Sequence, residues 1–199
     1  ISAEQLQRLL LERVYTPDPP DLVLALSPPS VAFWQRNSDT SFHEVPLLAA
    51  AAEVGGLDPQ YIARHWAVIA RFSFASQIAE IQQLLPDTKH VFMVFGASEH
   101  ERKLAAVAAA QVHEAFDDIE LEVSTDLSLD ELIDRVSGLD AGSVVYHVTF
   151  STDILGESIT DEEALARVSA ATSVPLFGPF DNQLGHGVVG GSLIQLEKT

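Results

Sequence analysis

Polar and aromatic side chains gather where the predicted strands of this chain end. They combine hydroxyl groups, carboxylates, one guanidinium and two aromatic rings, which can hydrogen-bond to a small ligand or stack against it. The candidate ligand-binding residues are Ser27, Ser98, Glu99, Arg102, Thr149, Phe150, Ser151, Asp153, Phe180 and Asp181. Because ligands of open α/β sheets bind beyond the carboxyl ends of the strands, we expect these residues to lie along such an edge.

Within this set, Ser98 and Arg102 indicate a site for an anion. Ser98 begins a predicted helix whose free amides and positive dipole end suit a carboxylate, and Arg102 can add a fork-shaped donor. The simpler interpretations are that Ser98 only caps its helix and that Arg102 pairs with Glu99 three residues earlier. For Phe150 and Phe180 the alternative to stacking on a ligand is packing in the core.

Motifs for other chemistry are missing from the sequence. The 7 His residues form no i, i+4 pair, and the absence of Cys excludes disulfides, thiolate metal sites and a Cys nucleophile. No nucleophile elbow, phosphate-binding Gly loop or dinucleotide fingerprint occurs. We therefore expect no catalytic residue, no metal and no cofactor. His147, inside a predicted strand, is interpreted as a hydrogen-bonded core residue, and His186 as an exposed loop residue.

The elements that position these residues repeat three times after residue 86. An apolar segment is followed each time by a capping box, in which a hydroxyl and a Glu three residues later cap a helix. The strand segments are His90–Phe95, Ile119–Val123 and Val144–Phe150, and the boxes are Ser98-x-x-Glu101, Ser128-x-x-Glu131 and Thr160-x-x-Glu163. A further apolar run at Val174–Phe177 completes the pattern of a parallel sheet with crossover helices.

The ends of the chain carry incomplete versions of this pattern. Ser2–Arg13 is predicted to be an amphipathic helix, and strands are predicted at Asp21–Leu26 and Val45–Ala50, with a helix up to Gln35 between them. Since a helix precedes the first strand, we expect an opening strand to be missing. Val188–Leu196 is predicted to be a terminal strand without a covering helix, so the chain is interpreted as the middle of a larger fold.

An extended segment separates two sets of elements. Asp58–Phe74 alternates apolar and smaller or polar residues and precedes a helix predicted over Phe74–Leu85. An extended bridge of this kind is typical of the hinge between two lobes. We therefore expect a partial N-terminal αβ lobe at residues 1–70 and a C-terminal αβ lobe at residues 71–199. The alternative is one continuous sheet.

The charge balance narrows the range of partners. The chain has 11 Lys plus Arg against 29 Asp plus Glu, a net charge of −18, and the acidic residues are spread along its length. Such a surface repels phosphate backbones and anionic lipid head groups, so nucleic acid is not expected as a partner. The longest apolar stretch, Leu104–Val112, is far shorter than the roughly 20 residues that a membrane span needs.

Several motifs between residue 86 and the C-terminus carry a family resemblance. They are Pro86-Asp87, Phe95-Gly-Ala-Ser98 with Glu101-Arg102, Ser128 to Leu132, Val144 to Phe150, Glu163-Ala-Leu-Ala-Arg167, Val174-Pro-Leu-Phe-Gly178, and Phe180-Asp181 with Leu184-Gly-His-Gly-Val-Val-Gly-Gly191. On these residues the chain resembles the periplasmic-binding-protein-like sensor domains of bacterial membrane histidine kinases. Those domains share their pattern with the substrate-binding proteins of some ABC importers. The resemblance extends loosely to Asp21–Ala50.

The resemblance implies a type I periplasmic-binding fold. This is an α/β fold with two three-layer αβα lobes, each built on a parallel sheet, which close on a small ligand. The first lobe would be incomplete here, because such domains have a strand and a helix before the helix at Ser2 and another helix after Leu196.

The implied function is ligand sensing outside the cytoplasm, in the periplasm, as part of an inner-membrane histidine kinase that signals by closing its cleft. The partners would be a small molecule and the transmembrane and cytoplasmic regions of the kinase. A solute-binding component of an ABC importer is the alternative, and a cytoplasmic α/β enzyme is a second one. An unpaired strand edge in the first lobe also leads us to expect either a homodimer that covers this edge or poor order in residues 1–60.

Overall fold

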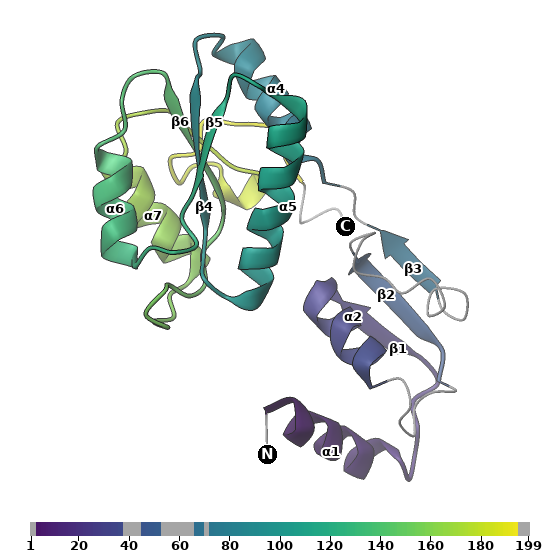
Figure 1. The fold of residues 1–199 in the computed structure, drawn as a ribbon. Helices are drawn as coiled ribbons and strands as arrows, with labels where there is room; N and C mark the ends of the chain where they lie inside the picture. Colours follow the sequence, from purple (N-terminus) through teal and green to yellow (C-terminus); the bar gives the residue numbers. More distant parts are fainter. Residues whose placement is uncertain (1–2, 38–44, 53–65, 70–71, 195–199) are drawn as a thin grey trace. The chain divides into compact units, whose positions relative to one another are not determined.

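The computed structural model describes residues 3–37, 45–52, 66–69 and 72–194 (Figure 1). The chain divides into two compact units, residues 1–72 and 73–199. Parallel strands and helices build both units, so each is of the α/β class.

Unit 1 contains a three-stranded parallel sheet. Its elements are α1 (Ala3–Tyr15), β1 (Val23–Leu26), α2 (Ser27–Arg36), β2 (Leu47–Ala52) and β3 (Trp66–Ile69), with strand order β1-β2-β3. Helix α2 covers one face of the sheet, where Val31 packs with Ala25, Leu47 and Ala49. Burying these small and branched side chains supplies the apolar core that a parallel sheet requires.

The predicted bridge between two lobes is wrong at its centre. Residues Trp66–Ile69 form β3, which pairs in parallel with β2 and places Leu48 beside Trp66. The alternation that suggested an extended bridge is therefore that of a strand inside the first sheet. The rest of the predicted bridge at residues 58–65 and 70–71, and the Ser2 start signal, lie outside the described residues.

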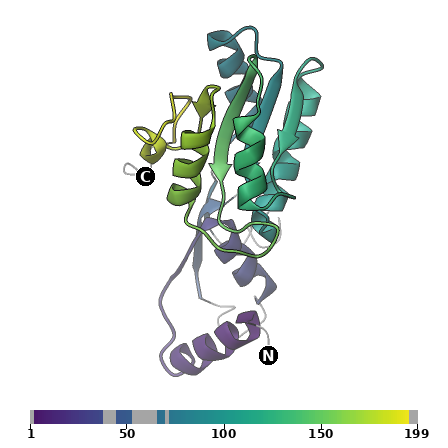
Figure 2. The ribbon, with the colours of Figure 1, turned by 90° about the vertical axis from the view of Figure 1, so that its left-hand side faces the viewer.

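Unit 2 contains the second parallel sheet, with strand order β5-β4-β6-β7. Helices cover both of its faces, with α6 and α7 on one side and α4 and α5 on the other (Figures 1 and 2). Its elements are α4 (Phe74–Leu84), β4 (His90–Phe95), α5 (Glu99–Ala115), β5 (Glu120–Val123), α6 (Leu129–Ser137), β6 (Ser143–Thr149), α7 (Asp161–Ala171), β7 (Leu176–Phe177) and the 3-10 turn η2 (Asp181–Gln183).

The central strands of unit 2 are buried on both faces. In β4 every residue from Val91 to Phe95 is fully buried, and in β6 the residues from Ser143 to Val148 are buried. This explains why both read in the sequence as continuous apolar runs rather than as alternating ones. Their helix-facing side chains form one core with those of α6 and α7, including Phe92, Val145 and Leu165.

The predicted helix starts of unit 2 are confirmed. Complete capping boxes form at Ser98 with Glu101 and at Ser128 with Glu131. At α7 the Thr160 hydroxyl accepts a hydrogen bond from the Glu163 amide, as predicted, but the return bond from the Thr160 amide to the Glu163 carboxylate is not formed. The boxes fix where each crossover helix begins, and hence where each loop leaves the sheet.

Two predicted strands differ from the structure. Strand β7 has only Leu176 and Phe177, because Pro175 has no amide to donate, although its carbonyl accepts the Val145 amide. Residues 188–194 make no strand, only isolated bridges such as Phe180 with Ile194. Gly190 and Gly191 both have φ of +145°, which interrupts the extended backbone that the apolar pattern predicted.

Strand β6 also carries a buried phenol. The Tyr146 side chain is fully buried and its hydroxyl makes no hydrogen bond within the part of the chain that the structure describes. Burial, with a smaller contribution from the nearby negative charge of Glu80, raises the pKa of this hydroxyl above its usual value. Tyr146 therefore stays protonated and belongs to the core between β6 and the helices on that face.

Candidate functional site

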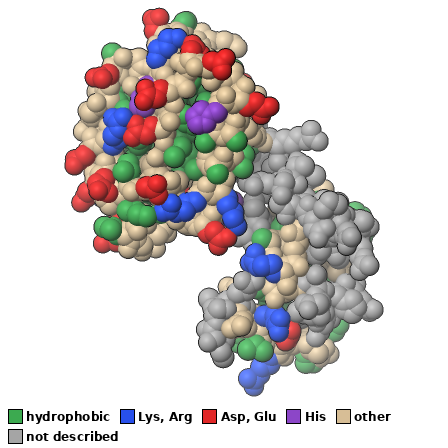
Figure 3. Space-filling model, in the orientation of Figure 1, with side chains coloured by type: hydrophobic (Ala, Val, Ile, Leu, Met, Phe, Trp, Pro, Cys, Tyr) green, Lys and Arg blue, Asp and Glu red, His purple; other side chains and the backbone are tan. Residues whose placement is uncertain are grey.

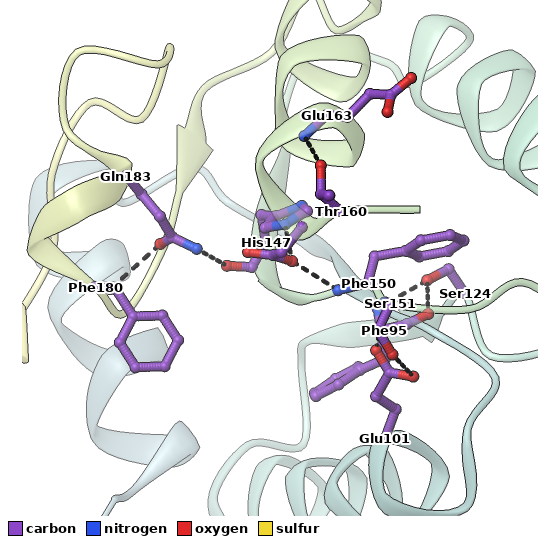
Figure 4. A network of polar contacts seen from close by, with 11 residues as sticks. Phe95, Glu101, Ser124, His147, Phe150, Ser151, Thr160, Glu163, Phe180 and Gln183 are labelled. Carbon is purple, nitrogen blue, oxygen red and sulfur yellow. Dashed lines mark hydrogen bonds and ion pairs between the residues drawn. The ribbon is translucent and has the colours of Figure 1, made fainter. Parts of the chain in front are cut away.

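The loops that follow the strands of unit 2 meet at the carboxyl edge of its sheet. The parallel order β5-β4-β6-β7 brings together the loops that begin at Ser124, Gly96, Phe150 and Gly178. We call this set of loops the carboxyl edge. Two networks of polar contacts run through it (Figure 4). This is the edge at which open α/β sheets place their ligands.

The first network is centred on Glu101, in the first turn of α5. Its carboxylate is almost completely buried, with 2% of the residue exposed. It accepts hydrogen bonds from the Ser151 amide at 2.7 Å, the Ser151 hydroxyl at 3.0 Å and the Ser98 amide at 3.1 Å. Since Ser98 follows β4 and Ser151 follows β6, one carboxylate joins the loops of two neighbouring strands.

Further hydrogen bonds extend this network beyond the strands. The buried Ser124 hydroxyl accepts from the Phe95 amide at 2.9 Å and donates to the Phe95 carbonyl at 2.7 Å. The Gly96 amide donates to the Thr149 carbonyl at 3.0 Å. The loops after β5, β4 and β6 are thus tied to one another by backbone and side-chain bonds, which gives a preorganised surface.

The second network joins β6 to α7 and to the turn η2. The buried His147 Nε2 lies 2.9 Å from the Asp161 carboxylate, which also accepts the Phe150 amide at 2.7 Å. The Gln183 amide group donates to the His147 carbonyl at 3.4 Å and accepts from the Phe180 amide at 3.2 Å. Gln183 therefore holds the segment with Phe180 and Asp181 against the end of β6.

Two glycines let these buried side chains approach the backbone. A Cβ on Gly96 would lie 2.5 Å from both carboxylate oxygens of Glu101, and one on Gly178 would lie 2.1 Å from the Gln183 side-chain oxygen. Both distances are far below any real contact. At both positions the missing Cβ leaves room for a polar side chain to close over the backbone.

The structure brings some of the predicted site residues together. Ser98 and Ser151 share the Glu101 carboxylate, and Thr149 joins the same network through its carbonyl. Phe180 and Asp181 are half-buried on the neighbouring segment that Gln183 holds. Ser27 belongs to unit 1, where it begins α2, and its side chain lies outside the described residues.

Other predicted residues have structural partners. Arg102 does not pair with Glu99. It donates to the Ala97 carbonyl in its own loop and to Asp126 in the loop after β5. Glu99 pairs instead with Lys103. Asp153 is buried and accepts the amides of its own loop at Leu155 and Glu157. The Phe150 ring is fully buried in the core, as the packing interpretation expects, and Phe150 also lines a pocket at this edge.

Sequence reasoning missed the residues that organise the edge. Glu101, Asp161, Gln183 and Ser124 were not among the candidates, and Glu101 was interpreted only as the second half of a capping box. The available signal for Glu101 was Gly96, which lies five residues before this glutamate in the first turn of the helix. The approach of Ser151 to Glu101 can be known only from the register between β4 and β6. His147 is confirmed as a hydrogen-bonded core residue.

Pockets open at both edges of the unit 2 sheet. One of about 230 Å³ opens at the carboxyl edge and is lined by residues that include Leu129, Asp153, Ile159 and Arg167. The other, of about 310 Å³, lies at the opposite edge beside Lys89, His90 and Arg135. Among the described residues, no cluster of three His, Asp or Glu side chains could hold a metal ion. None of the described helices is long and apolar enough to span a bilayer.

Comparison with solved structures shows which known folds this chain is similar to. A conserved domain protein from Vibrio cholerae matches with a TM-score of 0.64 at 14% identity, over 94% of this chain and 63% of that one. An ABC domain from Streptococcus pneumoniae, in complex with L-Trp, matches with a TM-score of 0.60 at 15% identity, over 93% and 61%. A ligand-free, open substrate binding protein with adhesive properties from Clostridium difficile matches with a TM-score of 0.60 at 16% identity, over 94% of this chain and 63% of that one.

The chain has a periplasmic-binding-protein-like fold. Its parallel sheets flanked by helices agree with this fold, as the sequence resemblance predicted. The chain spans less than two thirds of the length of each of the three structures. No protein-family model and no curated protein sequence matches it.

Proposed function

We propose that this chain is a solute-binding domain of the periplasmic-binding type, which binds a small polar molecule without transforming it. The observation that carries this proposal is the carboxyl edge of unit 2, where Glu101 and Gln183 fix the loops after three strands. A rigid edge built from polar loops is suited to hold a ligand. The neighbour in complex with L-Trp and the neighbour named as a substrate binding protein support the same function.

Binding rather than catalysis is also favoured by the state of the titratable groups at this edge. The His147 ring is fully buried and its Nε2 faces Asp161, so it does not meet a substrate as a general base. Glu101 is buried and uses both carboxylate oxygens for bonds within the chain. These groups organise backbone, and a cytoplasmic enzyme is the weaker alternative.

Two cellular contexts fit such a domain. In an ABC importer it would deliver the solute to a transporter outside the cytoplasm, and the substrate-binding neighbours favour this context. In a membrane histidine kinase, which the sequence resemblance favours, ligand-driven closure of the lobes would bias the attached transmembrane helices. The regions encoded around this chain in its gene decide between them: membrane spans with a kinase core indicate sensing.

Ligand binding is tested by thermal unfolding of the chain with a panel of amino acids, organic acids and sugars. A compound that binds only the folded state stabilises it by about 2.7 kcal/mol at a concentration of 100 Kd. We expect at least one compound to raise the melting temperature by several degrees. A panel in which no compound shifts the transition would contradict the proposed function.

The site is mapped with two matched substitutions at opposite edges of unit 2. Asp181→Asn changes the carboxyl edge, and Asp118→Asn changes an exposed carboxylate that pairs with Lys89 before the strands begin. We expect the first to weaken binding of the stabilising compound about tenfold and the second to leave it unchanged. Equal effects of the two would place the ligand elsewhere.

We further propose that two copies of the chain associate through unit 1. The sheet of unit 1 carries three large apolar side chains that are more than half exposed: Leu24 at 53%, Leu26 at 58% and Trp66 at 61%. The strand register aligns Leu24, Leu48 and Trp66 in one row across the sheet. An exposed apolar face of this kind favours association. We expect sedimentation to give about twice 21.6 kDa, and Leu24→Asp to give a monomer.

The control for that measurement is Leu84→Asp, which changes a comparably exposed leucine at the end of α4 in unit 2. This variant should remain a dimer. A monomeric unchanged chain at micromolar concentration would contradict the association.

A further inference from the structure

The helix N-termini at the carboxyl edge are occupied by the chain's own carboxylates. At α5, the Ser98 amide is bound by buried Glu101. At α6, the Ser128 amide is bound by Glu131 at 2.8 Å, and the Leu129 amide by Asp153 at 3.3 Å. A helix N-terminus normally favours a bound anion. Here a ligand anion would have to displace a carboxylate that the chain already holds in place.

The N-terminus of the third helix at this edge is made unfavourable for an anion in a different way. Helix α7 carries Asp161, Glu162 and Glu163 in its first turn. Asp161 also accepts the Phe150 amide, the first amide after β6. The negative charges of this turn neutralise the dipole end and repel an approaching anion.

The basic side chains near this edge are already paired. Arg102 donates to Asp126, Lys103 pairs with Glu99, and Arg167 donates to Asp130. The loops of the carboxyl edge, with the helix residues beside them, contain eleven acidic residues and only these three Lys or Arg. These segments are residues 96–103, 124–131, 150–167 and 178–187. Acidic side chains are also spread over the face of unit 2 seen in Figure 3. The local potential is therefore negative.

We infer that the ligand group facing the carboxyl edge of unit 2 is neutral or positively charged, and that carboxylate and phosphate groups are excluded from this edge. This inference rests on the proposed solute-binding function and names the chemical class of its ligand. It reverses the sequence-based expectation that Ser98 and Arg102 form an anion site. Hydroxyl, amide and ammonium groups can bind the loop carbonyls and carboxylates without displacing a chain carboxylate.

The inference is tested with ligands that share a skeleton and differ in charge. Binding of glucose, glucosamine and glucuronate, and of glutamine and glutamate, is measured by calorimetry at constant ionic strength. In the series that binds, we expect the anionic member to bind at least tenfold more weakly than its neutral or cationic counterpart. Tightest binding by the anionic member would overturn the inference while leaving the proposed function intact. Binding of no compound would overturn both.

A pair of charge-neutralising variants locates the origin of this discrimination. Asp126→Asn removes a charge at the carboxyl edge and breaks the ion pair of Arg102, whereas Asp118→Asn removes the same charge from the partner of Lys89 at the opposite edge. We expect Asp126→Asn to reduce the ratio of affinities between the neutral or cationic ligand and its anionic counterpart about threefold. Asp118→Asn should leave this ratio unchanged. Equal narrowing by both variants would overturn the inference, because the discrimination would then arise from the net charge of the whole chain.

Discussion

Replacing Glu101 with alanine is expected to lower the free energy of unfolding of unit 2 by about 3 kcal/mol. The substitution removes three hydrogen bonds to one buried carboxylate and leaves the amides of Ser98 and Ser151 without their partner. Urea unfolding followed by circular dichroism measures the loss. Tryptophan fluorescence is unsuitable, since both tryptophans, Trp34 and Trp66, lie in unit 1.

The neighbouring residue provides the control for this prediction. Glu99→Ala removes a carboxylate from the same helical turn, but that side chain is 84% exposed and pairs with Lys103 at the surface. Its expected effect is within about 0.5 kcal/mol. Hydrogen exchange at the Ser151 amide gives a local measurement, because exchange there should quicken in Glu101→Ala and not in Glu99→Ala. Equal stability of the two variants would mean that Glu101 does not hold the loops together.

Much of the fold of unit 2 was predictable because its signals are local. A capping box such as Ser128 with Glu131 fixes a helix start within four residues, and buried parallel strands appear as unbroken apolar runs. The strand β3 was misinterpreted because a short run of alternating apolar residues can equally form an extended bridge between two lobes. At Val188–Leu196, the apolar pattern was outweighed by the positive φ of Gly190 and Gly191.

The candidate site was harder to predict because its bonds are long-range. Glu101 and Ser151 are 50 residues apart in sequence, and nothing local distinguishes a capping glutamate in solvent from one buried under a neighbouring loop. The sheet register brings them together. The same holds for Gln183 in the turn η2, whose partner is the carbonyl of His147 on strand β6. The sequence predicted that most candidate residues lie at the carboxyl edge of one sheet, but the residues that organise this edge depend on tertiary contacts.

Replacing Gly178 with alanine is the second substitution with a large expected effect, about 2 to 3 kcal/mol of lost stability. The added Cβ would lie 2.1 Å from the side-chain oxygen of Gln183 and 3.2 Å from the carbonyl of His147. Gln183 must move, which breaks its bonds to Phe180 and His147. Urea unfolding measures the loss, and hydrogen exchange at the Phe180 amide shows whether this segment detaches. Because the segment also carries Asp181, binding of the solute should weaken in parallel.

Gly138→Ala is the matched control, because a Cβ at that position would meet no atom closer than 3.7 Å and the backbone there has φ of −96°. It should leave stability unchanged or raise it by up to about 1 kcal/mol, as expected when a glycine is replaced without strain. The double variant Gly178→Ala with Gln183→Ala identifies the cause. If the clash with Gln183 is responsible, the double variant loses no more stability than Gln183→Ala alone, since the side chain that must move is gone. Additive losses would instead place the strain at the His147 carbonyl.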